Sequence, residues 1–171
     1  KGFAFRMKPN DSMESVFSEL YERHIDTVYR ICYAMMGNRQ DAEDAAQSVF
    51  VKLMRSKMTF QSVEHEKAWL IATARNHCRD EHRRWWRKKV VKFETGMPDE
   101  QHADRLPQHE MMDGMRRLPP NHRLLLYLYY YEGYKLLEIA KMLKLNLNTV
   151  KTRMRDARKR LKLELGDDFI E

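Results

Sequence analysis

The end of the chain contains the spacing of a helix-turn-helix, and this pattern constrains the fold more than any other feature. Five small or apolar residues carry it: Ile139, Ala140, Leu143, Leu145 and Val150. A small side chain such as that of Ala140 fits where two helices cross closely. Leu143 and Leu145 flank the predicted turn, and Val150 is expected to hold the second helix against the first. The pattern therefore predicts a packed pair of helices with one open face.

The outer face of the second helix in this pair is cationic. Its basic residues are Lys151, Arg153, Arg155, Arg158, Lys159 and Arg160. Asn146 stands where it can cap the start of the helix, which directs free backbone N–H groups towards a phosphate. A packed inner face with a cationic outer face is what a reader of the DNA major groove requires. The sequence therefore predicts that the chain binds DNA.

The charge of the chain is concentrated in two stretches. Its net charge is +7, but residues 67–92 carry a local +7 and residues 147–162 a local +6, so the remainder sums to −6. Two separate basic stretches favour two contacts with one polyanion. The alternative is two helix faces that meet only water. Cys32 and Cys78 both lie in helical patterns, which favours free thiols and a cytoplasmic location.

Helical periodicity covers most of the chain, so the expected fold is all-α with two helical domains. The first domain spans 11–89 and contains a helix that starts at Asp41 and a long helix over about 64–89. Periodicity fades over 90–110, where glycine and prolines predict a flexible linker. The second domain spans 111–165 and includes a short helix near 111–118 and another over 121–132. No apolar run reaches membrane-spanning length, and no signal peptide is visible.

Three stretches, in order, give the chain a resemblance to a known family. They are FSELYERHIDTVYRICYAMMGNRQDAEDAAQSVFVKLMR, KAWLIATARNHCRDEHRR and the segment that begins LPPNHRLLLYLYYYEGYKLLEIAKMLKL. Together they resemble regions 2 and 4 of the extracytoplasmic-function (ECF) sigma factors of bacterial RNA polymerase. The resemblance implies a non-enzymatic protein that binds core polymerase, directs it to the −10 and −35 promoter elements and helps to open the duplex. It also implies control by an anti-sigma protein.

The resemblance assigns residues to both promoter elements. Positions that the family aims at the −35 element are occupied by Asn148, Thr149, Lys151, Thr152, Arg153, Arg155, Asp156, Arg158 and Lys159. The loop over 56–65 corresponds to the loop that captures a flipped −10 base, which requires polar edges and stacking surfaces. With the basic helix that follows, it gives the predicted −10 contacts Phe60, Gln61, Ser62, His65, Arg75, Asn76, Arg79, Arg83 and Arg84.

The same resemblance predicts a polymerase-docking helix between Asp41 and Met54, which contacts the coiled coil of the largest polymerase subunit. The predicted contacts are Asp41, Asp44, Gln47, Ser48, Phe50 and Leu53. Ser48 replaces the glutamate that commonly follows Gln47 in the family. This departure makes Asp44 and Gln47 the stronger candidates.

Two further departures affect the helix-turn-helix. Lys144 stands where the turn usually has glycine, and left-handed geometry at such a residue costs roughly 1 kcal/mol. Asp156 stands where the family usually has arginine. An acid facing DNA either accepts a hydrogen bond from cytosine or orients a neighbouring basic residue, for which Arg153 and Arg160 are candidates.

Two other classes of function fit parts of the sequence. A free-standing helix-turn-helix regulator would bind a palindromic operator as a dimer and without polymerase. An interaction protein would present its basic faces to an acidic partner and ignore nucleic acid. No metal or cofactor is expected, because Cys78 and His82 share a helix face with too few ligands for a zinc site.

Aromatic residues leave one alternative open. Trp85 and Trp86 lie in a basic run and either stack on bases or cover the flank of the first domain. Four tyrosines lie close together in the second domain, at Tyr127, Tyr129, Tyr130 and Tyr131. On a helix, most of these four are expected to belong to the core.

Overall fold

The computed structural model describes residues 13–56, 58–91, 115 and 117–165, and every regular element within these ranges is a helix. The predicted linker therefore lies outside the described residues, apart from its first two positions. The helices are α1 (Met13–Met36), α2 (Arg39–Arg55), α3 (Val63–Val91), α5 (Pro120–Tyr130), α6 (Leu136–Met142) and α7 (Leu147–Leu165). The prediction of an all-α fold is confirmed.

The first three helices pack against one another, and α2 and α3 both contact α1. Gly37, at a φ of 82°, ends α1 with a residue in the left-handed conformation that glycine adopts easily. The second helix begins at Arg39 rather than at Asp41, because Asn38 is the residue that caps it. The side-chain oxygen of Asn38 accepts a hydrogen bond from the backbone N–H of Asp41 at 2.9 Å.

A buried carboxylate joins α1 to the start of α3. Glu66 Oε1 lies 2.5 Å from His24 Nε2 and 2.8 Å from Arg23 Nη1. His24 and Glu66 are both buried, so each polar group depends on the other for hydrogen bonding. This contact sets the position of α3 along α1.

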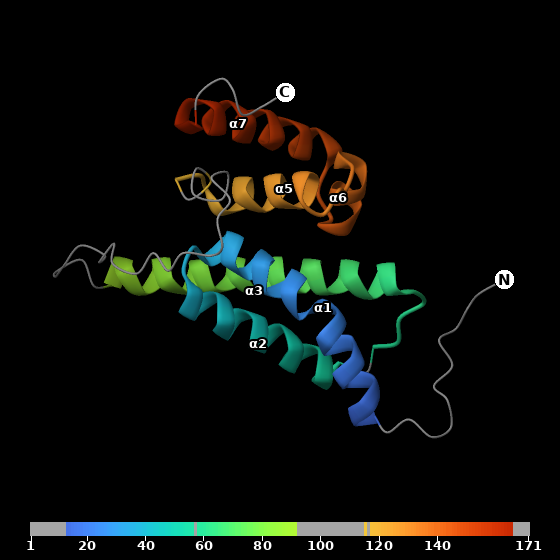
Figure 1. Cartoon of the computed structure of the whole chain (residues 1–171). Coiled ribbons are helices and arrows are strands. Elements are labelled where there is room, and N and C mark those ends of the chain that lie inside the picture. The colour runs from blue at the N-terminus through green and yellow to red at the C-terminus, as the bar shows by residue number, and fades with distance from the viewer. Residues whose placement is uncertain (1–12, 57, 92–114, 116, 166–171) are drawn as a thin grey trace.

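The last three helices form a second layer, in which α5 lies between α7 and the first three helices (Figure 1). The angle between α6 and α7 is set by a tight turn, in which Leu145 N donates to Ala140 O at 2.9 Å. Lys144 occupies this turn at a φ of 52°, so a lysine adopts the left-handed geometry usually given to glycine. The predicted helix-turn-helix is present.

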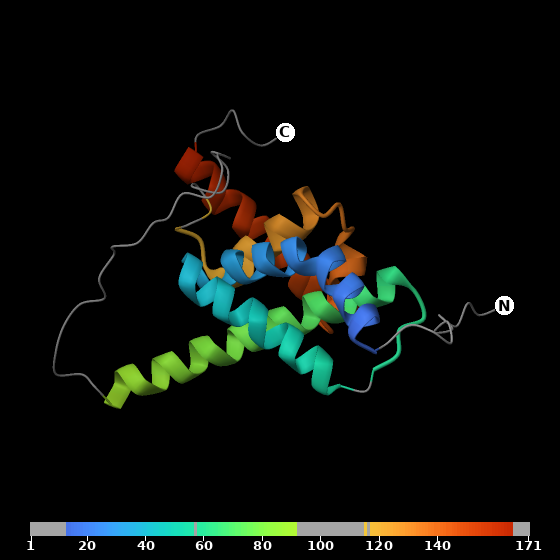
Figure 2. The ribbon, with the colours of Figure 1, turned by 60° about the horizontal axis from the view of Figure 1, so that its bottom comes forward.

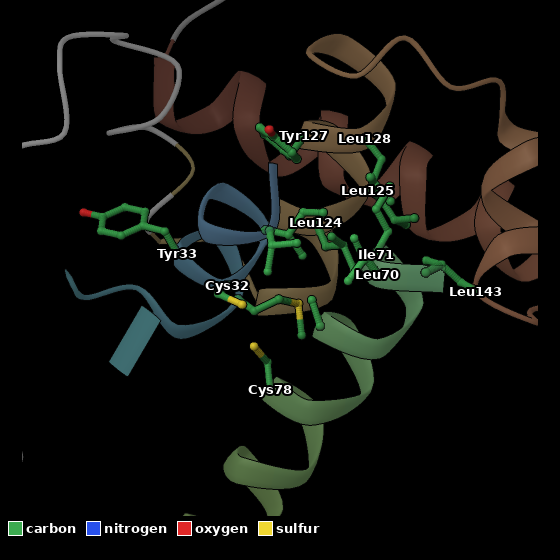
Figure 3. Packing of buried hydrophobic residues seen from close by; sticks show 14 of the residues in the cluster. Cys32, Tyr33, Leu70, Ile71, Cys78, Leu124, Leu125, Tyr127, Leu128 and Leu143 are labelled. Atoms are coloured by element: carbon green, nitrogen blue, oxygen red, sulfur yellow. The ribbon is translucent and has the colours of Figure 1, made fainter. Parts of the chain in front are cut away.

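One apolar cluster runs through both layers. Ile71 of α3 is fully buried, and Figure 3 shows it together with Leu70 of the same helix beside Leu124 and Leu125 of α5. Cys32 of α1 and Cys78 of α3 lie in the same core (Figure 3), and both are free thiols. The two helical domains thus share apolar surface in addition to having cores of their own.

Candidate nucleic-acid and polymerase interfaces

The second helix of the helix-turn-helix has a sharply divided surface. Its inner face is buried and consists of Val150, Met154, Ala157 and Leu161. Its exposed face carries the predicted −35 contacts Asn148, Lys151, Thr152, Arg155 and Lys159, whereas Thr149, Arg153, Asp156 and Arg158 are half-buried. Asn146 Oδ1 accepts from Asn148 N at 2.8 Å, so the predicted cap is formed at the end that would face a phosphate.

Three of the predicted −35 residues have side-chain partners within the chain. Asp156 Oδ1 lies 3.6 Å from Arg155 Nε, so the basic residue oriented by this acid is Arg155 rather than Arg153 or Arg160. The guanidinium of Arg158 lies 5.1 Å from the ring centre of Tyr129 and 5.7 Å from that of Tyr130. Arg158 therefore stabilises the contact between α5 and α7 through cation–π interactions.

The predicted base-capture loop ends in the first turn of α3. Ser62 Oγ accepts from His65 N at 3.1 Å, which caps the helix, and the exposed Gln61 stands just before it. Phe60 is half-buried, with its ring centre 5.8 Å from that of Trp69 and 5.7 Å from that of His65. Trp69 thus packs against the core and supports Phe60, whereas the polar side chains Gln61 and His65 remain exposed.

The basic face of α3 is divided between surface and interior. Asn76, Arg83 and Arg84 are exposed, and Arg84 pairs with Glu81 at 2.9 Å. Arg75 is only 7% exposed, because the helix-turn-helix lies against this part of α3. Its Nη1 is 3.5 Å from the carbonyl oxygen of Leu143, at the end of α6. The −10 set predicted from the sequence is therefore only partly accessible in this arrangement.

Two polar contacts hold the domains together. Arg123 of α5 donates to the last carbonyls of α1, with Nη2 2.9 Å from Met35 O and Nε bonded to Ala34 O. Its Nη1 also donates to Leu118 O at 2.9 Å. A cation at the end of a helix is stabilised both by the free carbonyls and by the helix dipole.

The second contact involves both oxygens of Glu132. Lys67 of α3 donates to Oε2 at 2.6 Å, and the hydroxyl of Tyr127 donates to Oε1 at 2.7 Å. Burial and the neighbouring Glu132 carboxylate raise the pKa of Tyr127, so its hydroxyl keeps the proton that it donates. Of the four tyrosines, most of which were predicted to belong to the core, Tyr127 is buried and Tyr129 is half-buried, but Tyr130 and Tyr131 are exposed.

The predicted polymerase contacts on α2 separate into two groups. Asp41, Asp44 and Gln47 are exposed, and Ser48 is half-buried with its hydroxyl donating to Asp44 O at 2.9 Å. Phe50 is only 3% exposed and Leu53 is also buried, which corrects their assignment as contacts. Both side chains pack into the core between α2 and its neighbours, where a partner cannot reach them.

Two apolar residues on the exposed face of α2 were not predicted as contacts from the sequence. Met54 is 65% exposed, and Val51 is exposed as well. With Asp44 and Gln47 they occupy positions 44, 47, 51 and 54, a spacing of three and four residues that defines one face of a helix. The same spacing is the seam that helices use in coiled-coil contacts, and this was the available signal. We call these four residues the α2 face.

The far end of α3 extends beyond its neighbours (Figures 1 and 2). Trp85 and Trp86 lie there with their ring centres 5.5 Å apart, and Trp86 is 61% exposed. They therefore do not cover the flank of the domain, which was one of the two predicted roles. Their surroundings include the exposed Arg83, Arg84 and Arg87.

Other chemistry has little support in the described part of the chain. No group of three or more His, Cys, Asp or Glu residues is arranged there to hold a metal ion. A hydrogen bond from the Cys32 thiol to Cys78, together with burial, raises the pKa of Cys32, so this thiol stays protonated and unreactive. Among the described helices, none combines the length and apolar character needed to cross a membrane.

Two models of protein families match the chain. Residues 20–88 match the model for sigma-70 region 2, and residues 114–163 match the model for sigma-70 region 4. The chain belongs to the ECF sigma factors. Members of this family are not enzymes, which agrees with the non-enzymatic function that the resemblance implied.

Individual relatives agree with this assignment. The chain is 30% identical over 155 residues to the ECF sigma factor SigE of Mycolicibacterium smegmatis, covering 85% of this chain but 60% of SigE. It is 26% identical to SigX of Bacillus subtilis, covering 92% of this chain and 91% of SigX. The sigma factor RpoE of Bartonella quintana, solved with the anti-sigma factor NepR, has a similar fold. Its TM-score is 0.72 at 20% identity, with 90% of this chain and 98% of that chain covered.

Proposed function

We propose that this ECF sigma factor binds core RNA polymerase in the cytoplasm, directs it to −10 and −35 promoter elements and promotes strand opening. Residues 11–89 would bind core polymerase and the −10 element, and residues 111–165 would bind the −35 element. A linker at 90–110 would connect the two domains. The observation that carries the proposal is the divided surface of α7, whose buried face fixes the helix while Lys151, Thr152 and Arg155 stay exposed. Phosphate contacts set the register on DNA, and base contacts set the sequence.

Run-off transcription with purified core polymerase tests this function directly. Added sigma factor should produce new start sites preceded by a shared pair of promoter elements. The alternative, a dimeric helix-turn-helix regulator, predicts binding to a palindrome without polymerase. A gel shift with and without core enzyme separates the two, because each domain alone contacts too little DNA for tight binding. Tight binding by the free chain to a palindrome would support the regulator instead.

On the −35 side, Arg155 and Lys159 are expected to have different roles. If Arg155 reads a base edge, Arg155→Ala should cost about 1–3 kcal/mol and relax the preference at one position of the element. Lys159→Ala should weaken all sequences equally and lower the salt slope by about one unit, as expected for a phosphate contact. The measurement is holoenzyme binding to promoter variants over a range of salt concentrations. The same change in base preference in both variants would contradict this division of roles.

For polymerase docking, the α2 face is the proposed contact. Met54→Asp should weaken binding at least tenfold, because a charge would replace the most exposed apolar side chain of this face. Folding should be unaffected, since the side chain is already 65% exposed. Pull-down with the coiled coil of the largest polymerase subunit provides the measurement. Leu163→Asp, at an exposed apolar residue of α7, is the matched control and should bind normally.

For regulation, we propose an anti-sigma protein that binds both domains. Family membership supports this partner, and so does the partial burial of the predicted −10 residues when the domains are docked. Coexpression with the product of a neighbouring gene should prevent binding to core polymerase. If the chain binds core enzyme equally well with and without coexpression, that product is not the partner.

A further inference from the structure

Three arginines gather where the helix-turn-helix meets α3. Arg75 and Arg79 are one turn apart on α3, and Arg153 of α7, on the other domain, is near enough for its charge to lower the pKa of Arg75. Arg75 is 93% removed from solvent, and Arg79 and Arg153 are half-buried. The junction lies where α3 contacts α6, beside the Leu143 carbonyl. We call these residues the arginine junction.

The positive charge of this junction is poorly compensated. Among the described residues, neither Arg75 Nε nor Arg79 Nε has a hydrogen-bond acceptor, although both atoms are buried. Arg75 Nη1 has only two long contacts, 3.4 Å to Asn76 Oδ1 and 3.5 Å to Leu143 O. In the described part of the chain, the one carboxylate in ion-pair range is Asp80, at 3.7 Å from Arg79 Nε.

Such an arrangement is unfavourable without an anion. A buried cation normally has a paired acid or a full set of acceptors, since desolvation is otherwise uncompensated. Burial lowers the pKa of Arg75, and the like charges of Arg79 and Arg153 lower it further. The lowered pKa means that the charged form of Arg75 is disfavoured at this position. The closed arrangement of the domains therefore brings like charges together at a desolvated position. An oxyanion would supply both the missing charge and the missing acceptors.

We propose that the arginine junction binds a phosphate group, and that a bound phosphate stabilises the docking of the two domains. Guanidinium groups present planar pairs of donors that match the oxygens of phosphate. One ligand can then connect α3 with α7, because its arginines come from both domains. The site goes beyond the proposed promoter function, which needs no ligand between the domains.

Arg75 and Arg79 are also proposed contacts of the −10 element, so the same donors have two possible sources of phosphate. A free phosphate fits the closed arrangement, in which Arg153 completes the junction. A phosphate of the DNA backbone would meet Arg75 only after the helix-turn-helix has moved away from α3. Free phosphate and promoter DNA should therefore favour opposite arrangements of the domains.

The test uses the full chain without polymerase. Inorganic phosphate is titrated against sodium chloride at matched ionic strength, and thermal unfolding and small-angle X-ray scattering are recorded. Phosphate should raise the melting temperature in a saturable manner and lower the radius of gyration, whereas chloride should do neither to the same extent. Equal effects of the two salts would overturn the proposal. So would binding of a short DNA duplex at this junction with no response to inorganic phosphate.

Substitutions of the junction arginines test whether the response to phosphate arises at this site. Arg153→Gln and Arg79→Gln should each weaken phosphate binding about tenfold or more, because each removes a charged hydrogen-bond donor. Arg75→Gln should remove the buried charge itself, so this chain should stay compact without phosphate and no longer respond to it. Arg84→Gln is the control, since Arg84 is exposed on the same helix and pairs with Glu81, and its response should be unchanged. Circular dichroism confirms that each variant is folded.

An unchanged response in the three junction variants would place the site elsewhere and overturn the proposal. Promoter-directed transcription is measured separately on the unsubstituted chain. Loss of the phosphate response would contradict phosphate binding but not promoter recognition. Failure of transcription would contradict promoter recognition but not phosphate binding.

Discussion

Replacing Arg123 by alanine is expected to release the second helical domain from the first. The guanidinium donates to two carbonyls in the last turn of α1, where helix carbonyls have no partner within the helix, and Met35 O also lies 3.0 Å from His82 Nε2. A hydrogen bond to a charged group contributes about 1.5–3 kcal/mol, so losing this contact should shift the docking equilibrium roughly ten- to hundredfold. An increase in the radius of gyration, or a fall in energy transfer between dyes on α2 and α7, measures the release.

Two further variants make this result specific. Arg123→Lys keeps the charge but has no planar fork, so it should restore docking only in part. Arg117→Ala removes an exposed arginine that pairs with Glu164 within the second domain, and it should leave docking unchanged. Undisturbed compactness in Arg123→Ala would mean that the shared apolar surface holds the domains by itself.

The second large effect is expected in the helix-turn-helix. Ile139→Ala should lower the free energy of unfolding by about 2–5 kcal/mol, because the side chain is 0% exposed and a cavity would remain between α6 and α7. The loss should also reduce −35 binding, since the angle of α7 depends on this contact. Urea denaturation and holoenzyme binding to promoter DNA are the measurements.

Leu137 provides a matched control on the same short helix. It is 50% exposed, so Leu137→Ala should change the free energy of unfolding by no more than about 0.5 kcal/mol. A similar loss of stability in both variants would show that α6 tolerates no truncation, whichever face is changed.

Much of the fold could be predicted because it depends on short-range rules. The apolar spacing around Ile139 and Ala140 defines the helix-turn-helix, and Gly37 marks the end of α1. The start of α2 was misplaced by two residues, because both Asn38 and Asp41 are suitable capping residues. The structure selects Asn38, whose side chain accepts from the Asp41 backbone.

The candidate interfaces were predicted less completely. Phe50 and Leu53 have the same periodicity as a docking face would have, so the sequence could not show that they belong to the core of the bundle. Met54 is as apolar as these two residues, but it is exposed, as is Val51. Periodicity identifies the faces of a helix, whereas the packing of neighbouring helices decides which of them is covered.

The sequence by itself determined the helices, their basic faces and the family, since capping, periodicity and local charge depend on residues only a few positions apart. The tertiary structure decided that Arg75 is buried, that Arg123 reaches the end of α1 and that Lys67 pairs with Glu132. These contacts join residues more than sixty positions apart. Only docking of the two layers brings such residues together, and no local rule encodes where those layers meet.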